Sequence, residues 1–151
     1  MAESMTTTFS RVDDGKTDHD FQAILNFTAS PDDVYEAVIS PAAITVWWVP
    51  TSGIGTAGGD LVFRFGDMKA DMHVEEAERP SRVRWNVLTC EPIPDWAGTY
   101  ITFDIAPAGD GGTRLVFRHY GLTPQLECFD MCQNGWTEHL SHLVDYVETG
   151  G

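Results

Sequence analysis

Cysteine and histidine side chains gather in the C-terminal part of the sequence, at Cys128, Cys132, His139 and His142. These are ligand types that zinc prefers. On a helix that rises 1.5 Å per residue, however, Cys128 and His139 lie roughly 16 Å apart, and Cys132 and His139 about 10 Å apart. A single metal ion needs its ligands within about 2 Å. We therefore predict no metal and no cofactor, and interpret the cysteines as small, soft side chains in a pocket wall.

Two histidines are weak candidates for acid–base catalysis, which requires a proton-transferring group inside an apolar cavity. His119 continues the inward-facing set of Leu115 and Phe117 on a predicted strand, so it could lie at a cavity rim. His139 lies beside the apolar stripe of a predicted helix. Neither has a recognisable carboxylate partner, and the sequence contains no nucleophile elbow or zinc-protease motif. We assign no catalytic residue and favour a rim or hydrogen-bonded core role for both.

Aromatic and sulphur-containing side chains could instead form the walls of an apolar ligand pocket. Such a pocket is concave and carries few polar groups. Trp48 and Trp96 lie next to predicted loops, where they can line its mouth. The residues predicted to bind the ligand are Trp48, Met72, Trp85, Trp96, Phe103, Phe117, Cys128, Met131 and Cys132. The alternative is that the same aromatic side chains fill the space and form a solid core.

The charge balance limits the partners. The 151 residues include 9 Lys and Arg against 23 Asp and Glu, a net charge of −14. Nucleic acids and anionic membrane surfaces are bound by clustered basic residues, so we expect neither as a partner. No stretch approaches the roughly 20 apolar residues of a membrane span. Residues 1–10 show no signal-peptide pattern, so we expect a cytoplasmic protein with reduced thiols.

A long helix over residues 123–149 is predicted to organise the fold. Thr123 offers an N-cap hydroxyl, Pro124 suits the first helical position, and Gly150 follows the end. An apolar stripe at helical spacing contains Phe129, Trp136, Leu140, Leu143, Val144 and Val147. This stripe needs an apolar partner of matching size.

Strands in the middle of the chain supply that partner. Apolar and polar residues alternate over 21–27, 61–65, 70–75, 82–87, 101–105 and 114–118. Such alternation is typical of an antiparallel sheet with one wet face. On that face, we expect Arg82, Arg84, Arg114 and Arg118 to pair across strands with Asp71, Glu75 and Asp104.

Two short helices are predicted between the first and second strands. Ser30-Pro31 and Ser40-Pro41 are helix-start signals, and the second helix is expected to run through Trp48. We expect both to pack against the long helix or the sheet end. The whole pattern is α+β, with a curved sheet around a long C-terminal helix.

Five blocks in this order resemble a known family. They are 27–37 (FTASPDDVYEA), 48–50 (WVP), 58–63 (GGDLVF), 112–119 (GTRLVFRH), and Gly135-Trp136 followed by Leu140 and Leu143. The set is similar to the C-terminal-type domain of activators of the heat-shock-protein-ninety ATPase, within the START-like (SRPBCC, pollen-allergen-like) helix-grip superfamily. The resemblance covers about residues 21–148 and implies a helix-grip fold. Because residues 1–19 are polar, we expect a flexible leader there and one domain over residues 20–151. The resemblance also implies a hydrophobic tunnel between sheet and helix.

These observations favour a binding module for a small hydrophobic or amphipathic ligand, as in the lipid carriers that the resemblance includes. A polyketide-cyclase-like enzyme using His119 or His139 is the first alternative. The second is a chaperone-binding or partner-binding module linked to the stress response, acting through the acidic helix face. A homodimer stays open, because no stretch of the sequence demands one.

Overall fold

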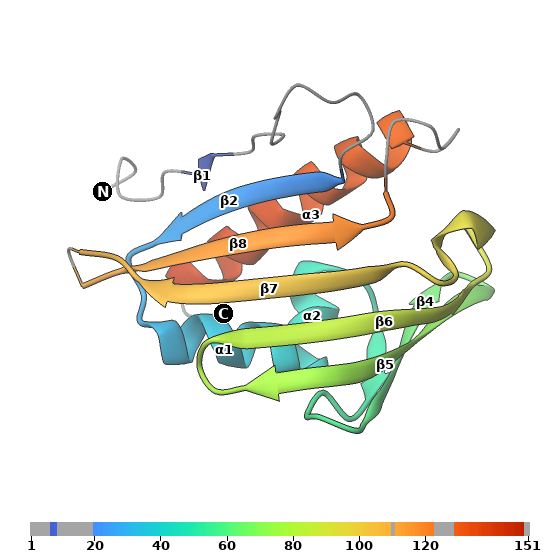
Figure 1. Cartoon of the computed structure of the whole chain (residues 1–151), viewed down its shortest axis with the longest axis horizontal. Helices are drawn as coiled ribbons and strands as arrows, with labels where there is room; N and C mark the ends of the chain where they lie inside the picture. The colour runs from blue at the N-terminus through green and yellow to red at the C-terminus, as the bar shows by residue number, and fades with distance from the viewer. Residues whose placement is uncertain (1–6, 9–19, 110, 123–128, 150–151) are drawn as a thin grey trace.

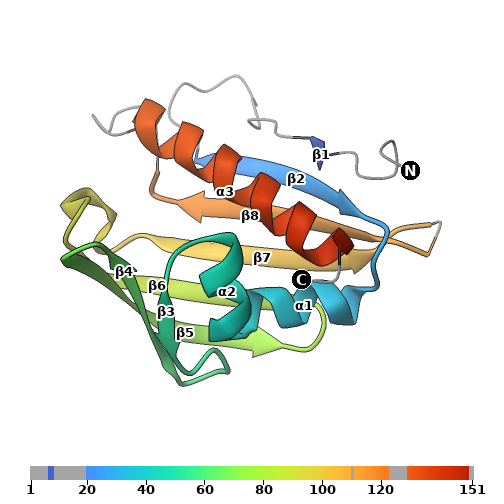
Figure 2. The ribbon, with the colours of Figure 1, turned by 180° about the vertical axis from the view of Figure 1, so that it is seen from behind.

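A curved antiparallel sheet carries three α-helices on one face in the residues that the computed structural model describes, 7–8, 20–109, 111–122 and 129–149 (Figures 1 and 2). The strand order is β1-β2-β8-β7-β6-β5-β4-β3. The strands are β1 (Thr7–Thr8), β2 (Phe21–Phe27), β3 (Thr51–Gly53), β4 (Asp60–Phe65), β5 (Met68–Glu78), β6 (Arg82–Cys90), β7 (Tyr100–Pro107) and β8 (Thr113–Tyr120). The helices are α1 (Pro31–Ile39), α2 (Pro41–Trp47) and α3 (Phe129–Thr149), with a 3₁₀ turn η2 (Pro94–Trp96).

This architecture confirms the predicted helix-grip fold. All six predicted strands are present, and α1 and α2 contact α3 as expected. The predicted helical segment 123–128 lies outside the described residues. Two strands were not predicted: β1, within the expected leader, pairs with β2, and β3 pairs with β4. At two and three residues, both are too short to show an alternating pattern. Helix α2 also ends at Trp47, one residue earlier than predicted.

Two serines begin the short helices. The Ser30 hydroxyl accepts a hydrogen bond from the Asp33 backbone N–H at 3.3 Å, and Pro31 occupies the first turn. Ser40 ends α1, where its own N–H donates to the Glu36 carbonyl at 3.0 Å. The Ser40 hydroxyl accepts from the Ala43 N–H and so begins α2. Because one residue serves as both caps, the two helices follow each other without a loop.

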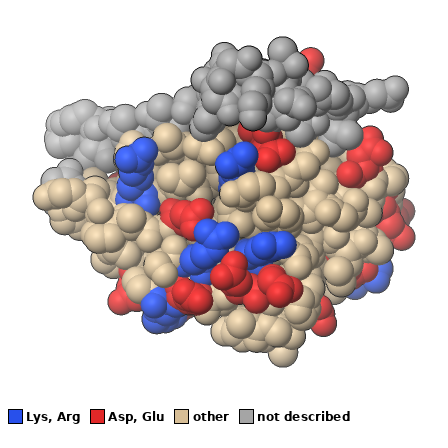
Figure 3. Space-filling model, in the orientation of Figure 1, with Lys and Arg blue, Asp and Glu red and all other residues tan. Residues whose placement is uncertain are grey.

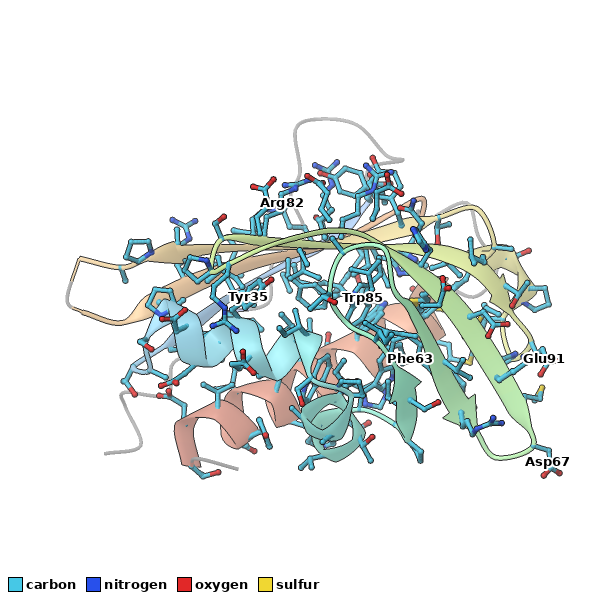
Figure 4. The ribbon with its side chains drawn as sticks, turned by 90° about the horizontal axis from the view of Figure 1, so that it is seen from below. Tyr35, Phe63, Asp67, Arg82, Trp85 and Glu91 are labelled. Carbon is cyan, nitrogen blue, oxygen red and sulfur yellow. The ribbon has the colours of Figure 1, made fainter. Side chains whose placement is uncertain are left out.

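The core lies between the sheet and the helices. Figure 4 shows Trp85 and Phe63 on the helix side of the sheet and Arg82 on the opposite side. The described part of the predicted apolar stripe on α3 faces the core: Trp136, Leu140, Leu143 and Val144 are buried, and Val147 is half-buried. Register shifts in β5, between Asp71 and Met72 and between Val74 and Glu76, interrupt its pairing with β6. Such bulges bend a strand, which helps the sheet to curve around α3.

The outer face of the sheet carries mixed charges, which Figure 3 shows side by side. Arg82 contacts both Glu76 and Asp104, carboxylates on the two neighbouring strands. The Arg84 guanidinium lies 3.8 Å from the Tyr100 ring centre. The predicted cross-strand pairing of Arg82 with Asp104 is therefore confirmed. Arg118 pairs with Asp20 and Asp71 pairs with Lys69, which were not the predicted partners.

Helix α3 is tied to the sheet at its C-terminal end. The Glu148 carboxylate accepts hydrogen bonds from the Thr28 N–H at 3.1 Å, the Thr28 hydroxyl at 2.6 Å and the Ala29 N–H at 3.2 Å. These donors lie in the turn between β2 and α1, so this turn and the end of α3 are held together. The opposite end of α3 lies over the cavity described next.

Candidate ligand-binding site

A cavity of about 180 Å³ lies between the first turns of α3, the end of α2 and the loop that joins β6 to β7. An apolar cavity of about 150 Å³ is large enough to hold benzene. The cavity is lined by Trp48, Phe65, Cys90, Pro92, Ile93, Trp96, Met131, Cys132, Gly135, Trp136 and His139. The lining is therefore almost entirely apolar, and its size suits a small organic molecule.

Three indole rings contribute to the wall, and the half-buried Trp48 is more accessible than the buried Trp96 and Trp136. The Trp96 and Trp136 rings are parallel, 6° apart in plane and 5.6 Å between centres. The Trp48 ring lies 4.9 Å from Trp136 and 4.7 Å from Phe63. Packed aromatic rings have few rotatable bonds, so they present flat and rigid surfaces.

The end of α2 positions Trp48. Its backbone N–H donates to the Ile44 carbonyl at 2.8 Å and closes the last turn. The neighbouring Trp47 is buried and donates its indole N–H to the Ala37 carbonyl at 2.8 Å. Trp47 is therefore a core residue, whereas the half-buried Trp48 reaches the cavity.

The β6–β7 loop positions Trp96. The Thr99 hydroxyl donates to the Trp96 carbonyl at 2.6 Å, and the Gly98 N–H donates to the Val87 carbonyl at 3.0 Å. The Trp96 indole N–H contacts the Cys132 sulphur of α3 at 3.3 Å. These bonds hold Trp96 against α3 and close one side of the cavity.

His119 is a hydrogen-bonded core residue, one of the two roles favoured from the sequence, and it does not lie at the cavity rim. It is fully buried, and its Nδ1 accepts a 3.1 Å hydrogen bond from the Trp136 indole N–H. Because an indole N–H can only donate, the ring proton lies on Nε2, 2.8 Å from the Thr99 hydroxyl. Burial lowers the pKa of His119 to about 3. The imidazole is therefore neutral, and it lies behind the tryptophans without lining the cavity.

His139 does line the cavity, where its half-buried ring lies 6.1 Å from the Trp48 ring. Its Nδ1 is buried and has no hydrogen-bond partner among the described residues. Burial lowers the pKa of His139; the charge of Glu138 raises it and that of His142 lowers it, both to a smaller extent. His139 is therefore a neutral imidazole with one unsatisfied nitrogen.

The predicted ligand-binding residues divide into two groups. Trp48, Trp96, Met131 and Cys132 line the cavity, although the Met131 side chain is 62% exposed. The fully buried side chains that do not line it are Met72, Trp85, Phe103 and Phe117. These four lie on strands whose inner face is filled by core side chains. Cys128 lies outside the described residues.

Sequence reasoning missed Gly135. It lies within α3 and lines the cavity, and a β-carbon built there would meet no atom within 4 Å. Glycine inside a helix costs about 1 kcal/mol relative to alanine. Its position in the helical pattern was the available signal. The other missed wall residues are Phe65, Cys90, Pro92, Ile93 and Trp136.

A second hollow of about 310 Å³ lies between α1, α2 and the last turns of α3. Its lining includes Asp33, Glu36, Ser40 and Tyr146, and Glu36 also pairs with Arg79. This polar surface suits an apolar ligand less well than the indole-walled cavity.

No three His, Cys, Asp or Glu side chains in the described part of the chain are grouped to hold a metal ion. Within the same residues, no helix is long and apolar enough to cross a membrane.

The curved sheet, the long C-terminal helix and the cavity beneath it define a helix-grip protein. The chain belongs to the family described as activator of Hsp90 ATPase homolog 1-like protein, whose model matches residues 28–148. This match confirms the resemblance found in the sequence. No curated protein matches the chain.

Solved structures support the same assignment. The Aha1 dimer from Colwellia psychrerythraea is 25% identical, has a TM-score of 0.74, and the match covers 85% of this chain and 96% of that one. CalU16 from Micromonospora echinospora is 19% identical, with a TM-score of 0.70, and the match covers 95% of this chain and 82% of CalU16. DynU16, from the dynemicin biosynthetic locus, is 24% identical, with a TM-score of 0.68, and the match covers 85% of this chain and 47% of DynU16. CalU16 and DynU16 show the fold alone.

Proposed function

We propose that this chain binds a small apolar molecule in the cavity beneath the first turns of α3. The observation that carries the proposal is the wall of three indole rings from Trp48, Trp96 and Trp136 around a space of about 180 Å³. Burial of apolar surface supplies roughly 25 cal/mol per Å², so an apolar ligand gains free energy from contact with these walls.

Gly135 offers the sharpest test of this function. Gly135→Leu places a side chain where no atom lies within 4 Å, so it fills the cavity without a clash at the β-carbon. Leucine also favours the helix by nearly 1 kcal/mol over glycine. We expect this variant to unfold at a higher urea concentration than the wild type while losing ligand binding.

Native mass spectrometry measures the binding. We expect the freshly purified wild type to retain a small molecule that denaturation releases, and Gly135→Leu to lack it. Leu88→Ala serves as a matched surface control, because Leu88 is 53% exposed and does not line the cavity. An apoprotein mass for the wild type, or the same adduct on Gly135→Leu, would contradict cavity binding.

The alternatives have less support. A cyclase-like enzyme needs a histidine that can exchange protons with a substrate, but His119 is sealed in the core, and His139 has no hydrogen-bonded carboxylate among the described residues. The Colwellia structure is a dimer, which is a property of that protein. In this chain, homodimer formation stays open, and chaperone binding through the acidic helix face stays a prediction.

A further inference from the structure

The hollow of about 310 Å³ between α1, α2 and the last turns of α3 is separate from the apolar cavity and shares no lining residue with it. Its floor is small and apolar, because Ala37 and Ala43 are buried there and Val147 is half-buried. Two exposed carboxylates, Asp33 and Glu36, line it from α1. The hollow therefore combines apolar contact area with accessible negative charge.

The helices around the hollow carry charged side chains of one sign only. Helix α1 has three Asp or Glu residues and α3 has four, and none of the three helices contains Lys or Arg. Every Lys and Arg that the structure describes lies on a strand or on a turn between strands. The last turns of α1 and α3 also border the hollow (Figure 2), and the carbonyl end of a helix favours cations. This side of the molecule therefore attracts a positively charged partner.

The neighbouring side of α1 already holds an arginine by the same chemistry. Arg79, on the turn between β5 and β6, pairs with Asp32 at 3.1 Å and also with Glu36. Its guanidinium lies 4.7 Å from the Tyr35 ring centre. The hollow offers the same combination, since carboxylates of α1 and the half-buried Tyr146 both line it.

An arginine side chain matches this lining. Its methylene stem lies on apolar surface while its charged end stays in contact with water and carboxylates. A planar guanidinium binds carboxylates through paired N–H bonds and stacks on aromatic rings. Arg79 contacts one oxygen of Glu36, Oε2, and Asp33 forms no ion pair with a described residue. Carboxylate oxygens at the hollow are therefore available to a second guanidinium.

We propose that this hollow is the docking site for a basic, arginine-bearing segment of a partner protein. One arginine of the segment enters the hollow, where Asp33 and Glu36 bind its guanidinium and Tyr146 contacts its flat face. The exposed Asp145, one residue before Tyr146, extends the negative surface beyond the hollow. A segment with more than one basic residue therefore gains more than a single small cation. This inference is independent of the apolar cavity and goes beyond the function proposed above.

The test uses a pentapeptide of alternating alanine and arginine with both ends blocked. The control peptide has citrulline, the uncharged analogue of arginine, at the same positions. Each is titrated into the full chain at low ionic strength, and nuclear magnetic resonance follows the backbone N–H groups of Ser40 and Val147. We expect the arginine peptide to shift both resonances in a saturable way and the citrulline peptide to leave them unchanged.

Two double variants locate the binding. Asp33→Asn with Glu36→Gln keeps the shape of the hollow but removes two charges, so we expect the arginine peptide to bind about fivefold more weakly, the effect of losing two exposed ion pairs. Asp130→Asn with Glu138→Gln removes the same charge from residues of α3 that do not line the hollow. This matched control should change the affinity by less than about twofold.

Three results would overturn the proposal. Equal weakening by the two double variants would show that only the net charge attracts the peptide. Unmoved resonances with the arginine peptide, or equal shifts with the citrulline peptide, would show that the hollow does not recognise arginine. A dimer of the wild type that sedimentation detects, and that the Asp33→Asn, Glu36→Gln variant does not form, would place a second copy of this chain in the hollow instead of a partner segment.

Discussion

Trp136→Ala is expected to lower the free energy of unfolding by about 4 kcal/mol, the usual range for deleting a buried tryptophan. The Trp136 side chain is 1% exposed, and its ring packs 4.6 Å from Phe117 and 4.9 Å from Trp48. The truncation also leaves the buried Nδ1 of His119 without its hydrogen-bond donor. Urea unfolding followed by circular dichroism measures the change.

Two further variants separate packing from hydrogen bonding at this position. Trp136→Phe keeps an aromatic ring but removes the N–H, so we expect a smaller loss of about 1–3 kcal/mol. Met131→Ala, on the same helix and 62% exposed, should stay within about 0.5 kcal/mol of the wild type. A Trp136→Ala protein within 1 kcal/mol of the wild type would show that Trp136 does not hold the core together.

Acidification is expected to destabilise the protein through His119. Its pKa is about 3 in the folded state, against about 6.5 in an unfolded chain. Between these values the unfolded chain binds a proton that the folded chain does not. The contribution of His119 to stability is therefore complete above about pH 6.5 and falls as the pH decreases, by about 1.4 kcal/mol per pH unit. From pH 7.5 to 4.5 the loss amounts to about 3 kcal/mol.

Comparison with His119→Gln isolates this effect from the carboxylates, which titrate in the same acidic range in both proteins. Glutamine cannot gain the proton, yet its amide keeps a hydrogen-bonding group beside Thr99 and Trp136. We expect the variant to be less stable at pH 7.5 but to lose about 3 kcal/mol less than the wild type between pH 7.5 and 4.5. Parallel profiles of unfolding free energy against pH would show that His119 does not act in this way.

Most of the fold could be predicted because its signals are local. Alternation over 82–87 and the serine–proline pairs at 30–31 and 40–41 each specify one element from a few neighbouring residues. The strand at 51–53 could not be predicted, because its three residues show no alternation and pair only through the tertiary position of β4. The order of layers followed from the wide apolar stripe of the C-terminal helix, whose described part packs on the sheet.

The site was less predictable, because an alternating or helical pattern shows on which face of its element a residue lies but not how deeply its side chain is buried. His119 and Phe117 share an inward face, yet whether such a residue meets a cavity or the core depends on how the helix crosses the sheet. Trp48 and Trp96 were easier to predict as cavity residues, since tryptophans next to loops have space on one side. Gly135 carried an unused signal, because a glycine within a helix often marks a close approach or an open space.

Nuclear magnetic resonance of the five tryptophan indole N–H groups tests the central claim most directly, with p-xylene as the probe. Trp48, Trp96 and Trp136 line the cavity, whereas Trp47 and Trp85 are buried away from it. We predict that p-xylene shifts the first three resonances in a saturable way, leaves Trp47 unchanged, and has no effect on any of them in Gly135→Leu. Unmoved resonances in the wild type, or shifts that persist in Gly135→Leu, would contradict a ligand-binding cavity beneath the C-terminal helix.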